Sequence, residues 1–390
     1  MKKVYILGGV RSYIGVENRM YRHVPAEILG ARTLQKAAAP YSKKDMNGVI
    51  AGNGVGAGGN ITRLMMLEAG FPMEIPGFTI DLQCGSGLES IGVAAAKIGC
   101  GMGDLYIAGG FESSSTAPRR GYNQNHPDYE KYNGGENWYH VAKFSPGEHR
   151  EYAMIEGAER VAVKEQISRE EMNSWVIRSH QMAKKARETG VLSKKAVSVL
   201  DGCNKDEGIR ERMSESFLNR LPYILPEGQK ITAGNACLTH DGAAFVVLCS
   251  EEYLRENHLV PEAEFIDIAE IGGNPMESPV TAVMAATKLL QKNGLTSKDI
   301  DIFECNEAFA VIDVLFARKY PDCVERYNIF GGALAYGHPY GASGGIITLH
   351  AMEALKFVNG RYGVCSIAAA GGVGTAILIQ NISNDAFFME

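Results

Sequence analysis

The chain has 390 residues, 45% of them hydrophobic and 22% charged, with a formal net charge of −6. This length predicts two or three domains around a large core, and the acidic balance disfavours nucleic-acid binding. The eight cysteines show no CxxC pairing and the histidines no zinc-type spacing, so we expect a reducing compartment and no metal. The apolar run near the N-terminus is too short for a signal peptide or a membrane span. We therefore expect a cytoplasmic protein without a membrane partner.

Four apolar runs bordered by glycine predict buried strands in the first part of the chain. They cover residues 4–9, 48–53, 78–83 and 105–110. Alanine-rich helical patterns lie between the runs, such as "ESIGVAAAKIGCG" at 89–101. This alternation of strand and helix predicts a mostly parallel sheet covered by helices on both faces.

The C-terminal third repeats this plan, with strands, helices and glycine-rich turns in the same order. Ser86 follows "CG" and Ser343 follows "GA", each at the start of a predicted helix. We infer a duplicated α/β domain whose two turns face a shared site. The polar, loop-rich middle predicts an insertion over that site. The predicted parts are an N-terminal half at 1–116 continued at 241–262, a loop domain at 117–240, and a C-terminal half at 263–390.

Cys84 lies between an apolar run and a glycine–serine–glycine turn, where a helix is predicted to begin. Backbone N–H groups and the positive end of the helix dipole at such a position favour a thiolate. His338, in a glycine-rich loop, is a candidate partner for a Cys–His pair. Taken alone, however, a buried cysteine is more often structural and a loop histidine more often a polar surface residue.

Several motifs together resemble the ordered signatures of the thiolase family over nearly the whole chain. They are "CGSGL" from Cys84, "GGFESSS" from Gly109, "NEAFA" from Asn306 and "GHPYGASG" from Gly337. The resemblance implies a five-layered αβαβα fold of two similar halves, with a loop domain that grips coenzyme A. It also implies a homodimer or homotetramer that acts on acyl-CoA and CoA, with coenzyme A as a substrate and no bound cofactor.

The resemblance also assigns roles to single residues. Cys84 would be the nucleophile that becomes acylated, and His338 would take its proton and later hydrogen-bond the thioester oxygen. Asn306 would hold a water that completes this oxyanion site, as acyl transfer requires donors where charge develops. The substrate and coenzyme A contacts implied in the same way are Cys237, Met154, Phe309 and Gly371.

The sequence departs from the family at the position of a second cysteine, which moves a proton at the α-carbon of the second acyl-CoA. Here that position is Ala368, and alanine cannot transfer a proton. Cys305 is a possible substitute, although a regular strand would point it away from the site. Cys365 is predicted on the opposite face of its strand, and a site that another branch of the family uses is Ala308. Water or Tyr340 is the remaining alternative.

Three functions follow as alternatives. The first is a thiolase that carries out 3-ketoacyl-CoA thiolysis or Claisen condensation with a substitute acid/base. The second is a thiolase-fold acyltransferase that acylates Cys84 but delivers the group to another acceptor. The third is a catalytically silent CoA-binding subunit, which the presence of Cys84, His338 and Asn306 disfavours.

A dinucleotide-binding alternative comes from a GxGxxG pattern at Gly54, Gly56 and Gly59 after an apolar run. The acidic residue of that motif should end the next strand, but Glu74 precedes the next predicted strand. We therefore interpret these glycines as a tight turn.

Overall fold

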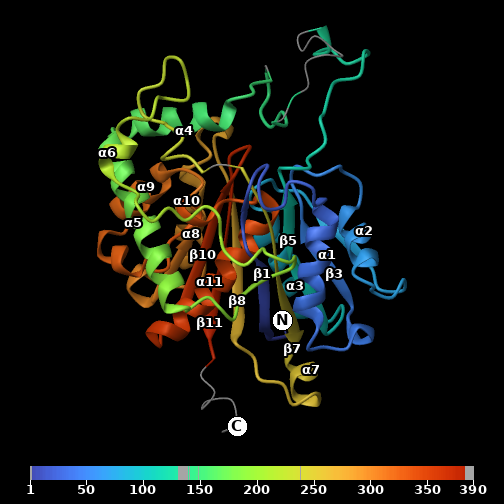
Figure 1. Ribbon diagram of the computed structural model, residues 1–390. Coiled ribbons are helices and arrows are strands. Elements are labelled where there is room, and N and C mark those ends of the chain that lie inside the picture. Colours follow the sequence, from blue (N-terminus) through green and yellow to red (C-terminus); the bar gives the residue numbers. More distant parts are fainter. Residues whose placement is uncertain (1, 131–138, 140, 148, 238, 383–390) are drawn as a thin grey trace.

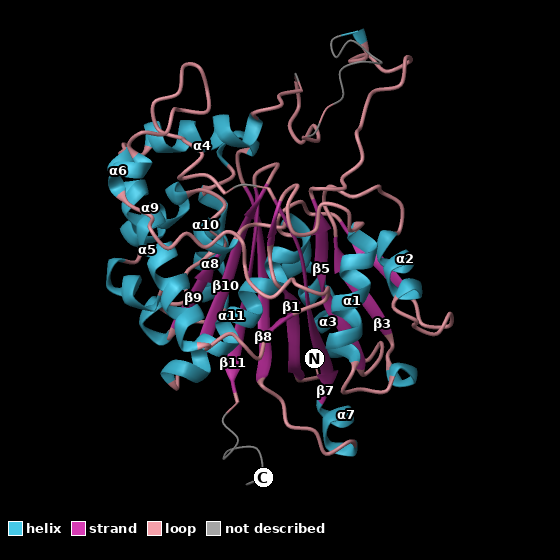
Figure 2. Cartoon of the chain, viewed as in Figure 1, coloured by secondary structure: helices cyan, strands magenta, loops and turns pink. Residues whose placement is uncertain are grey.

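The structure is a computed structural model that describes residues 2–130, 139, 141–147, 149–237 and 239–382. Its centre is a mixed sheet flanked by helices (Figures 1 and 2). No helix within the described ranges is long and apolar enough to cross a membrane.

The N-terminal half of the sheet has the spatial order β4-β3-β5-β7-β1. Two short strands extend it, because β2 pairs with β7 and β6 pairs with β1. The strand bounds are β1 Val4–Ser12, β2 Gly15–Val16, β3 Gly48–Gly52, β4 Gly77–Ile80, β5 Leu105–Ser113, β6 Ala196–Val197 and β7 His240–Ser250.

The C-terminal half has the order β8-β11-β10-β9. Its strands are β8 Ala263–Gly272, β9 Ile302–Cys305, β10 Tyr362–Ala369 and β11 Val373–Asn381. The first strands of the two halves, β1 and β8, pair over Val4–Ile6 and Ala263–Phe265 and so join the halves. In each half the first strand of the chain pairs with the last one, which confirms the predicted repetition of strand order.

The helices fall into three groups. Those of the N-terminal half are α1 Ala26–Ala38, α2 Ile61–Glu68, α3 Ser86–Gly99 and α7 Glu251–Glu256. Those of the C-terminal half are α8 Val280–Lys292, α9 Ala310–Lys319, α10 Ala333–Tyr336 and α11 Ser343–Val358. The segment between β5 and β7 supplies α4 Ala153–Lys164, α5 Arg169–Thr189 and α6 Glu215–Leu218.

The elements form five layers. Helices α1 and α2 cover the outer face of the N-terminal strands, and α8 and α9 cover the outer face of the C-terminal strands. Helices α3 and α11 pack against each other and against strands of both halves. Three buried apolar clusters follow this layering, one in the centre and one under each outer helix layer.

The prediction of a mostly parallel sheet is wrong. The pairs β3–β4, β3–β5 and β9–β10 are parallel, but β1–β7, β5–β7, β1–β8, β8–β11 and β10–β11 are antiparallel. The chain reverses directly from β10 into β11 through the left-handed glycines Gly371 and Gly372. Two strands joined by such a tight turn can only pair antiparallel. The alternation of strands and helices along the sequence does not reveal this turn.

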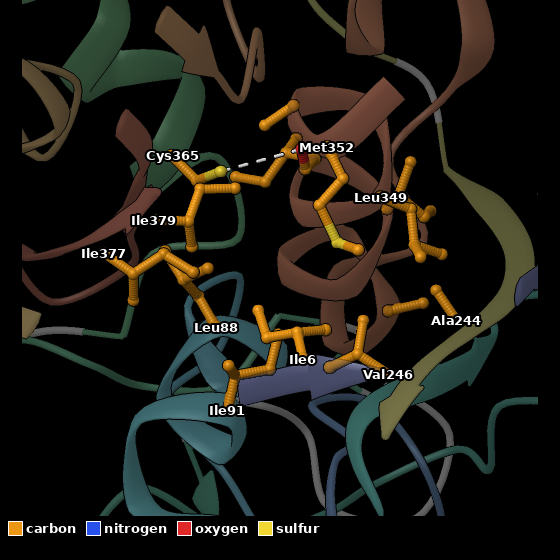
Figure 3. Packing of buried hydrophobic residues seen from close by; sticks show 14 of the residues in the cluster. Ile6, Leu88, Ile91, Ala244, Val246, Leu349, Met352, Cys365, Ile377 and Ile379 are labelled. Carbon is orange, nitrogen blue, oxygen red and sulfur yellow. Dashed lines mark hydrogen bonds between the residues drawn. The ribbon is translucent and has the colours of Figure 1, made fainter. Parts of the chain in front are cut away.

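The central layer brings α3 and α11 into backbone contact. Leu88 and Ile91 of α3 share the central cluster with Leu349 and Met352 of α11 (Figure 3). At the crossing, a Cβ added to Gly344 would lie 1.9 Å from the backbone nitrogen of Leu88. Glycine is therefore required there, and it fixes how closely the starts of the two helices approach.

The helices of the inserted segment have clear sequence reasons for their bounds. Helix α5 begins after Ser168, whose hydroxyl accepts a hydrogen bond from the Glu171 N–H, while the Glu171 carboxylate accepts from the Ser168 N–H. This capping box satisfies two amides at the helix start. The helix ends at Gly190, which adopts a left-handed conformation with φ 70°.

Candidate active site

A tight turn between β4 and α3 holds Cys84. The strand ends at Ile80, earlier than predicted, and Gln83 adopts a left-handed φ of 50°. The Ser86 hydroxyl accepts from the Leu82 N–H at 2.8 Å and donates to the Gln83 carbonyl at 2.6 Å. Ser86 is the first residue of α3, as the sequence predicts. The turn therefore places Cys84 immediately before the N-terminus of the helix, with its side chain 7% exposed.

Burial determines the ionisation of Cys84. It raises the pKa of the thiol to about 12, although the backbone N–H groups of Cys84 and Ala370 act in the opposite direction. The sequence-based expectation of a thiolate is thus wrong for the unliganded site, because the cost of desolvating the anion exceeds the effect of the amides. A proton acceptor is needed before Cys84 can act as a nucleophile.

His338 lies in the equivalent turn of the other half, before α11. Its Nδ1 lies 2.6 Å from the Ser343 hydroxyl oxygen, and that hydroxyl donates to the Pro339 carbonyl at 3.3 Å. Since the hydroxyl proton is directed at Pro339, we assign the imidazole proton to Nδ1. The Nε2 atom then carries the lone pair, and it has no hydrogen-bond partner within the described residues.

The imidazole of His338 is neutral in this environment. Burial, followed by the effect of His240, lowers the pKa of His338 to about 3. Gly337, with φ 116°, brings the backbone against the His240 ring, where a Cβ would lie 2.2 Å from a ring carbon. A neutral imidazole with a free Nε2 lone pair can accept a proton, as the predicted role requires.

A cavity of about 360 Å³ connects these two turns. Five of the site residues predicted from the sequence line it: Cys84, His338, Cys237, Met154 and Phe309. Its wall also includes Pro118, Arg120 and Tyr152 from the segment predicted as the loop domain. The structure therefore gathers residues from both halves and from the insertion around one cavity.

Asn306 is the first candidate that does not line this cavity. It lines a separate buried cavity of about 10 Å³, together with Gly337 and Ser343, the residues that flank and hold His338. The Asn306 Nδ2 atom has no hydrogen-bond partner within the described residues. Asn306 is thus near the histidine turn, although it does not line the cavity that Cys84 and His338 share.

Gly371 and Cys305 are also outside the described wall of the large cavity. Ala370, next to Gly371, does line it. Cys305 lies in the C-terminal apolar cluster, and its backbone N–H and carbonyl are both bonded to the Asn328 side chain. Burial raises the pKa of the Cys305 thiol to about 12. The structure therefore gives Cys305 no access to the cavity as an acid or base.

The structure also places the alanines at the positions where the resemblance leads one to expect a second cysteine. Ala368 is buried in the C-terminal cluster, and Ala308 lines the cavity without an ionisable group. The Cys365 thiol points at α11, where its Sγ lies 3.7 Å from the Ile347 carbonyl oxygen (Figure 3). The opposite-face prediction for Cys365 is confirmed.

Sequence reasoning missed the role of Glu112, which belongs to the quoted "GGFESSS" motif. Its fully buried carboxylate accepts from the Gly54 N–H at 2.8 Å, the Val55 N–H at 3.2 Å and the Gly341 N–H at 3.1 Å. Burial raises its pKa to about 7 against these donors. The carboxylate ties the loop after β3 to the histidine turn. Because it occupies the amides of the GxGxxG loop, they are not directed at a dinucleotide phosphate.

Comparison with known proteins gives the family. Residues 4–252 match the "Thiolase, N-terminal domain" and residues 259–381 match the "Thiolase, C-terminal domain". The 3-oxoadipyl-CoA/3-oxo-5,6-dehydrosuberyl-CoA thiolase of Escherichia coli (strain K12) is 33% identical over 401 residues, which cover 98% of this chain and 100% of the relative.

Solved structures agree with this match. The crystal structure of the Bacillus anthracis acetyl-CoA acetyltransferase is 29% identical, covers 98% of this chain and 99% of that chain, and superposes with a TM-score of 0.87. The human mitochondrial 3-ketoacyl-CoA thiolase in complex with CoA is also 29% identical, covers 98% of each chain, and has a TM-score of 0.89. Fold and matches together define an acyltransferase enzyme. The chain belongs to the thiolase family and is a thiolase-type acyltransferase.

Proposed function

We propose that the protein binds acyl-CoA thioesters and catalyses 3-ketoacyl-CoA thiolysis, or the reverse Claisen condensation, through an acyl-Cys84 thioester. The observation that carries this proposal is the shared cavity, where Cys84 and the base-form His338 come from opposite halves of the fold. A neutral thiol beside a neutral imidazole with a free lone pair is the starting state for nucleophilic catalysis.

The first step is proton transfer from the Cys84 thiol to His338 Nε2, which creates the thiolate at the moment of attack. The backbone N–H groups of Cys84 and Ala370 lie close enough to the sulfur to act on its pKa. They are therefore suited to stabilise the oxyanion that forms when the sulfur adds to a carbonyl. Ser343 holds the ring of His338 in place for both transfers of the proton.

Asn306 would act through a water molecule. The cavity that it lines is about 10 Å³, which is close to the space that one water needs. Its unpartnered Nδ2 can donate to such a water. We propose that the water and His338 together form the second oxyanion site.

Coenzyme A would enter past the inserted segment. Met154 and Phe309 offer apolar wall, and Cys237 directs its Sγ at the Ala333 carbonyl at 3.1 Å. Support for coenzyme A comes from the similar human thiolase that was solved with CoA. Gly371, whose left-handed conformation turns the chain beside Ala370, would shape the wall without contributing a side chain.

We also propose a homodimer or homotetramer that uses coenzyme A as a substrate and needs no metal or bound cofactor. The N-terminal half ends in the edge strand β4, which carries Phe78 with 38% exposure. An unpaired edge of this kind is suited to pairing with a second copy. None of the eight cysteines, all of which lie in the described part of the chain, forms a disulfide, which supports the expected reducing, cytoplasmic compartment. Sedimentation velocity would measure the assembly.

The test of the main proposal has two stages. Purified protein is incubated with acetyl-CoA, and intact mass followed by peptide mapping should locate one acetyl group on Cys84. Thiolysis of acetoacetyl-CoA by free CoA is then followed by loss of the 3-keto thioester. Acetylation elsewhere, or none at all, would refute the acyl-Cys84 step.

A second function is favoured by one observation, the alanine at position 368. If Cys84 becomes acetylated but acetoacetyl-CoA is not cleaved, the enzyme is an acyltransferase that delivers its acyl group to another acceptor. The two functions are thus separated by the same pair of measurements.

A further inference from the structure

Tyr340 is placed beside both members of the Cys–His pair. It opens the short 3-10 turn Tyr340–Ala342, two residues after His338, and lines the same cavity as Cys84. Its ring stands edge-on to the His338 ring, with centroids 5.0 Å apart and an interplanar angle of 89°. No residue that the structure describes forms a hydrogen bond with its hydroxyl. The phenol therefore has a proton to give within the cavity.

The electrostatic surroundings of Tyr340 point in the same direction. Burial is the largest cause of a raised pKa for its hydroxyl, and Cys84 is the ionisable group that affects it most, followed by Cys237. The hydroxyl is therefore protonated, and its pKa responds to the Cys84 thiol that would attack the substrate.

Two other protonated side chains near Tyr340 in the cavity wall, Cys237 and Thr239, are already engaged. The Cys237 thiol donates to the Ala333 carbonyl at 3.1 Å. The Thr239 hydroxyl donates its proton to the Glu17 carboxylate and therefore has no proton directed at a substrate. Tyr340 differs from them because its hydroxyl has no such partner among the described residues, and it lines the same cavity as Cys84.

We propose that Tyr340 is a catalytic residue that transfers the proton at the α-carbon of the departing or entering acetyl-CoA, in place of the thiol that position 368 lacks. This assignment rests on the proposed thiolase function and deepens it. It explains how a chain with Ala368 and Ala308 could still break a carbon–carbon bond at this site.

The proton balance in thiolysis closes with Tyr340 in this role. His338 takes the proton of Cys84, and the thiolate adds to C3 of the 3-ketoacyl-CoA. The C2–C3 bond breaks and its electron pair passes to C2 as the enolate of acetyl-CoA. Tyr340 donates its hydroxyl proton to C2, which gives acetyl-CoA and a phenolate.

The second half of the cycle restores each group. The entering CoA loses its thiol proton to solvent and adds as the thiolate to the acyl-Cys84 carbonyl, while the Tyr340 phenolate takes a proton from solvent. The C–S bond to Cys84 breaks, the acyl-CoA leaves, and the His338 imidazolium returns its proton to the Cys84 thiolate. While the Tyr340 phenolate exists, the His338 imidazolium lies against its ring. The two opposite charges therefore stabilise each other.

The experiment separates acylation from proton transfer in wild type and in Tyr340→Phe. Acetylation of Cys84 by acetyl-CoA is measured by intact mass. Proton transfer is measured as deuterium uptake into the methyl group of acetyl-CoA in D₂O, and carbon–carbon cleavage as acetoacetyl-CoA thiolysis. Loss of general acid–base catalysis should lower the last two rates of Tyr340→Phe by about 10²-fold or more, with acetylation retained within about threefold.

Tyr106→Phe is the matched control. Tyr106 lies on β5 outside the cavity, and its hydroxyl donates to the Met102 carbonyl at 2.6 Å. This variant should keep both acetylation and deuterium uptake. Cys237→Ser is measured beside it as the competing candidate.

Each other outcome overturns the assignment. If Tyr340→Phe took up deuterium at the wild-type rate, another group would have to transfer the proton. Loss of deuterium uptake in Cys237→Ser would identify that group as Cys237. Loss of acetylation in Tyr340→Phe would mean that Tyr340 acts in the first step instead. A wild type that acetylates Cys84 but takes up no deuterium would refute Tyr340 and leave the acyltransferase alternative. A wild type that does not acetylate Cys84 would instead refute the proposed function itself.

Discussion

The turn before α3 and the turn before α11 occupy equivalent places in the two halves, and each starts its helix with a buried serine, Ser86 or Ser343. Their chemistry differs. The N-terminal turn offers a thiol, whereas the C-terminal turn offers an imidazole and, two residues later, a phenol. Two similar frames thus meet at one cavity, and one carries a thiol and the other an imidazole, which the proposed function uses as nucleophile and base.

The serines show the difference most directly. Ser86 uses its hydroxyl on the backbone of its own turn, at Leu82 and Gln83. Ser343 uses its hydroxyl on the His338 ring. The same residue at the same place therefore shapes a turn in one half and orients a side chain in the other.

The largest expected effect is on the nucleophilic turn. Cys84→Ala removes the only proposed site of acylation, and turnover should fall by about 10⁴-fold or more. The measurement is acetyl incorporation by intact mass together with acetoacetyl-CoA thiolysis. Cys100→Ala, at the exposed C-terminal end of the same helix α3, is the control and should retain both. Acetyl labelling that persists in Cys84→Ala would contradict the assignment.

A smaller loss is expected on the basic turn. His338→Gln removes the proton acceptor but keeps Cys84, and turnover should fall by about 10²–10⁴-fold. Initial rates of thiolysis and of Cys84 acetylation should fall together, because both need the thiolate. The exposed His23→Gln variant controls for the substitution. If acetylation in His338→Gln kept its wild-type rate, another group would have to be the base.

The basic turn should also respond to acid. The pKa of His338 is lowered to about 3 in the folded protein by burial, so the unfolded chain takes up this proton first as the pH falls below about 6.5. Stability from this group is present above pH 6.5 and is lost on acidification. Between pH 7.5 and 5.0 the wild type should therefore lose about 2 kcal/mol of unfolding free energy relative to His338→Gln.

Urea denaturation at the two pH values measures this difference. If the difference in unfolding free energy between wild type and His338→Gln were the same at both pH values, His338 would not be held neutral by its surroundings.

The smallest expected effect concerns the serine that orients the base. Ser343→Ala frees the Nδ1 side of His338, and kcat should fall by about tenfold with KM little changed, since geometry rather than binding is lost. Ser343→Thr keeps the hydroxyl and should restore part of the rate. Ser90→Ala, a buried serine one turn into α3, is the control. A change in KM alone would place Ser343 in substrate binding instead.

The sequence predicts much of the frame because glycine borders and apolar runs are local signals. The strands near 4–9, 48–53 and 105–110 exist, and both helices begin at the predicted serines. The direction of strand pairing was missed, because the alternation of strands and helices does not register the tight Gly371–Gly372 reversal into β11 or the return of β7 after a long segment. The predicted fold class was still correct, because it rested on the ordered motifs and the repeated order of elements and not on the direction of strand pairing.

The site was predicted less completely, for electrostatic and geometric reasons. Motifs bring Cys84 and His338 to one cavity correctly. They do not give the burial that makes both groups neutral, which depends on contacts between the two halves. Nor do they reveal that Asn306 faces a separate small cavity, or that Glu112 connects the two turns through Gly341. Such contacts depend on where the chain returns in space.

The close crossing of α3 and α11 has a consequence for synthesis on the ribosome. Helix α3 is made early and α11 almost last, yet each supplies half of the central apolar layer. In a growing chain, Cys84 therefore precedes a helix whose apolar face has no partner helix until α11 has been made. His338, in the turn before α11, reaches its place only when α11 packs against α3. The proposed site is therefore completed by the last step of folding.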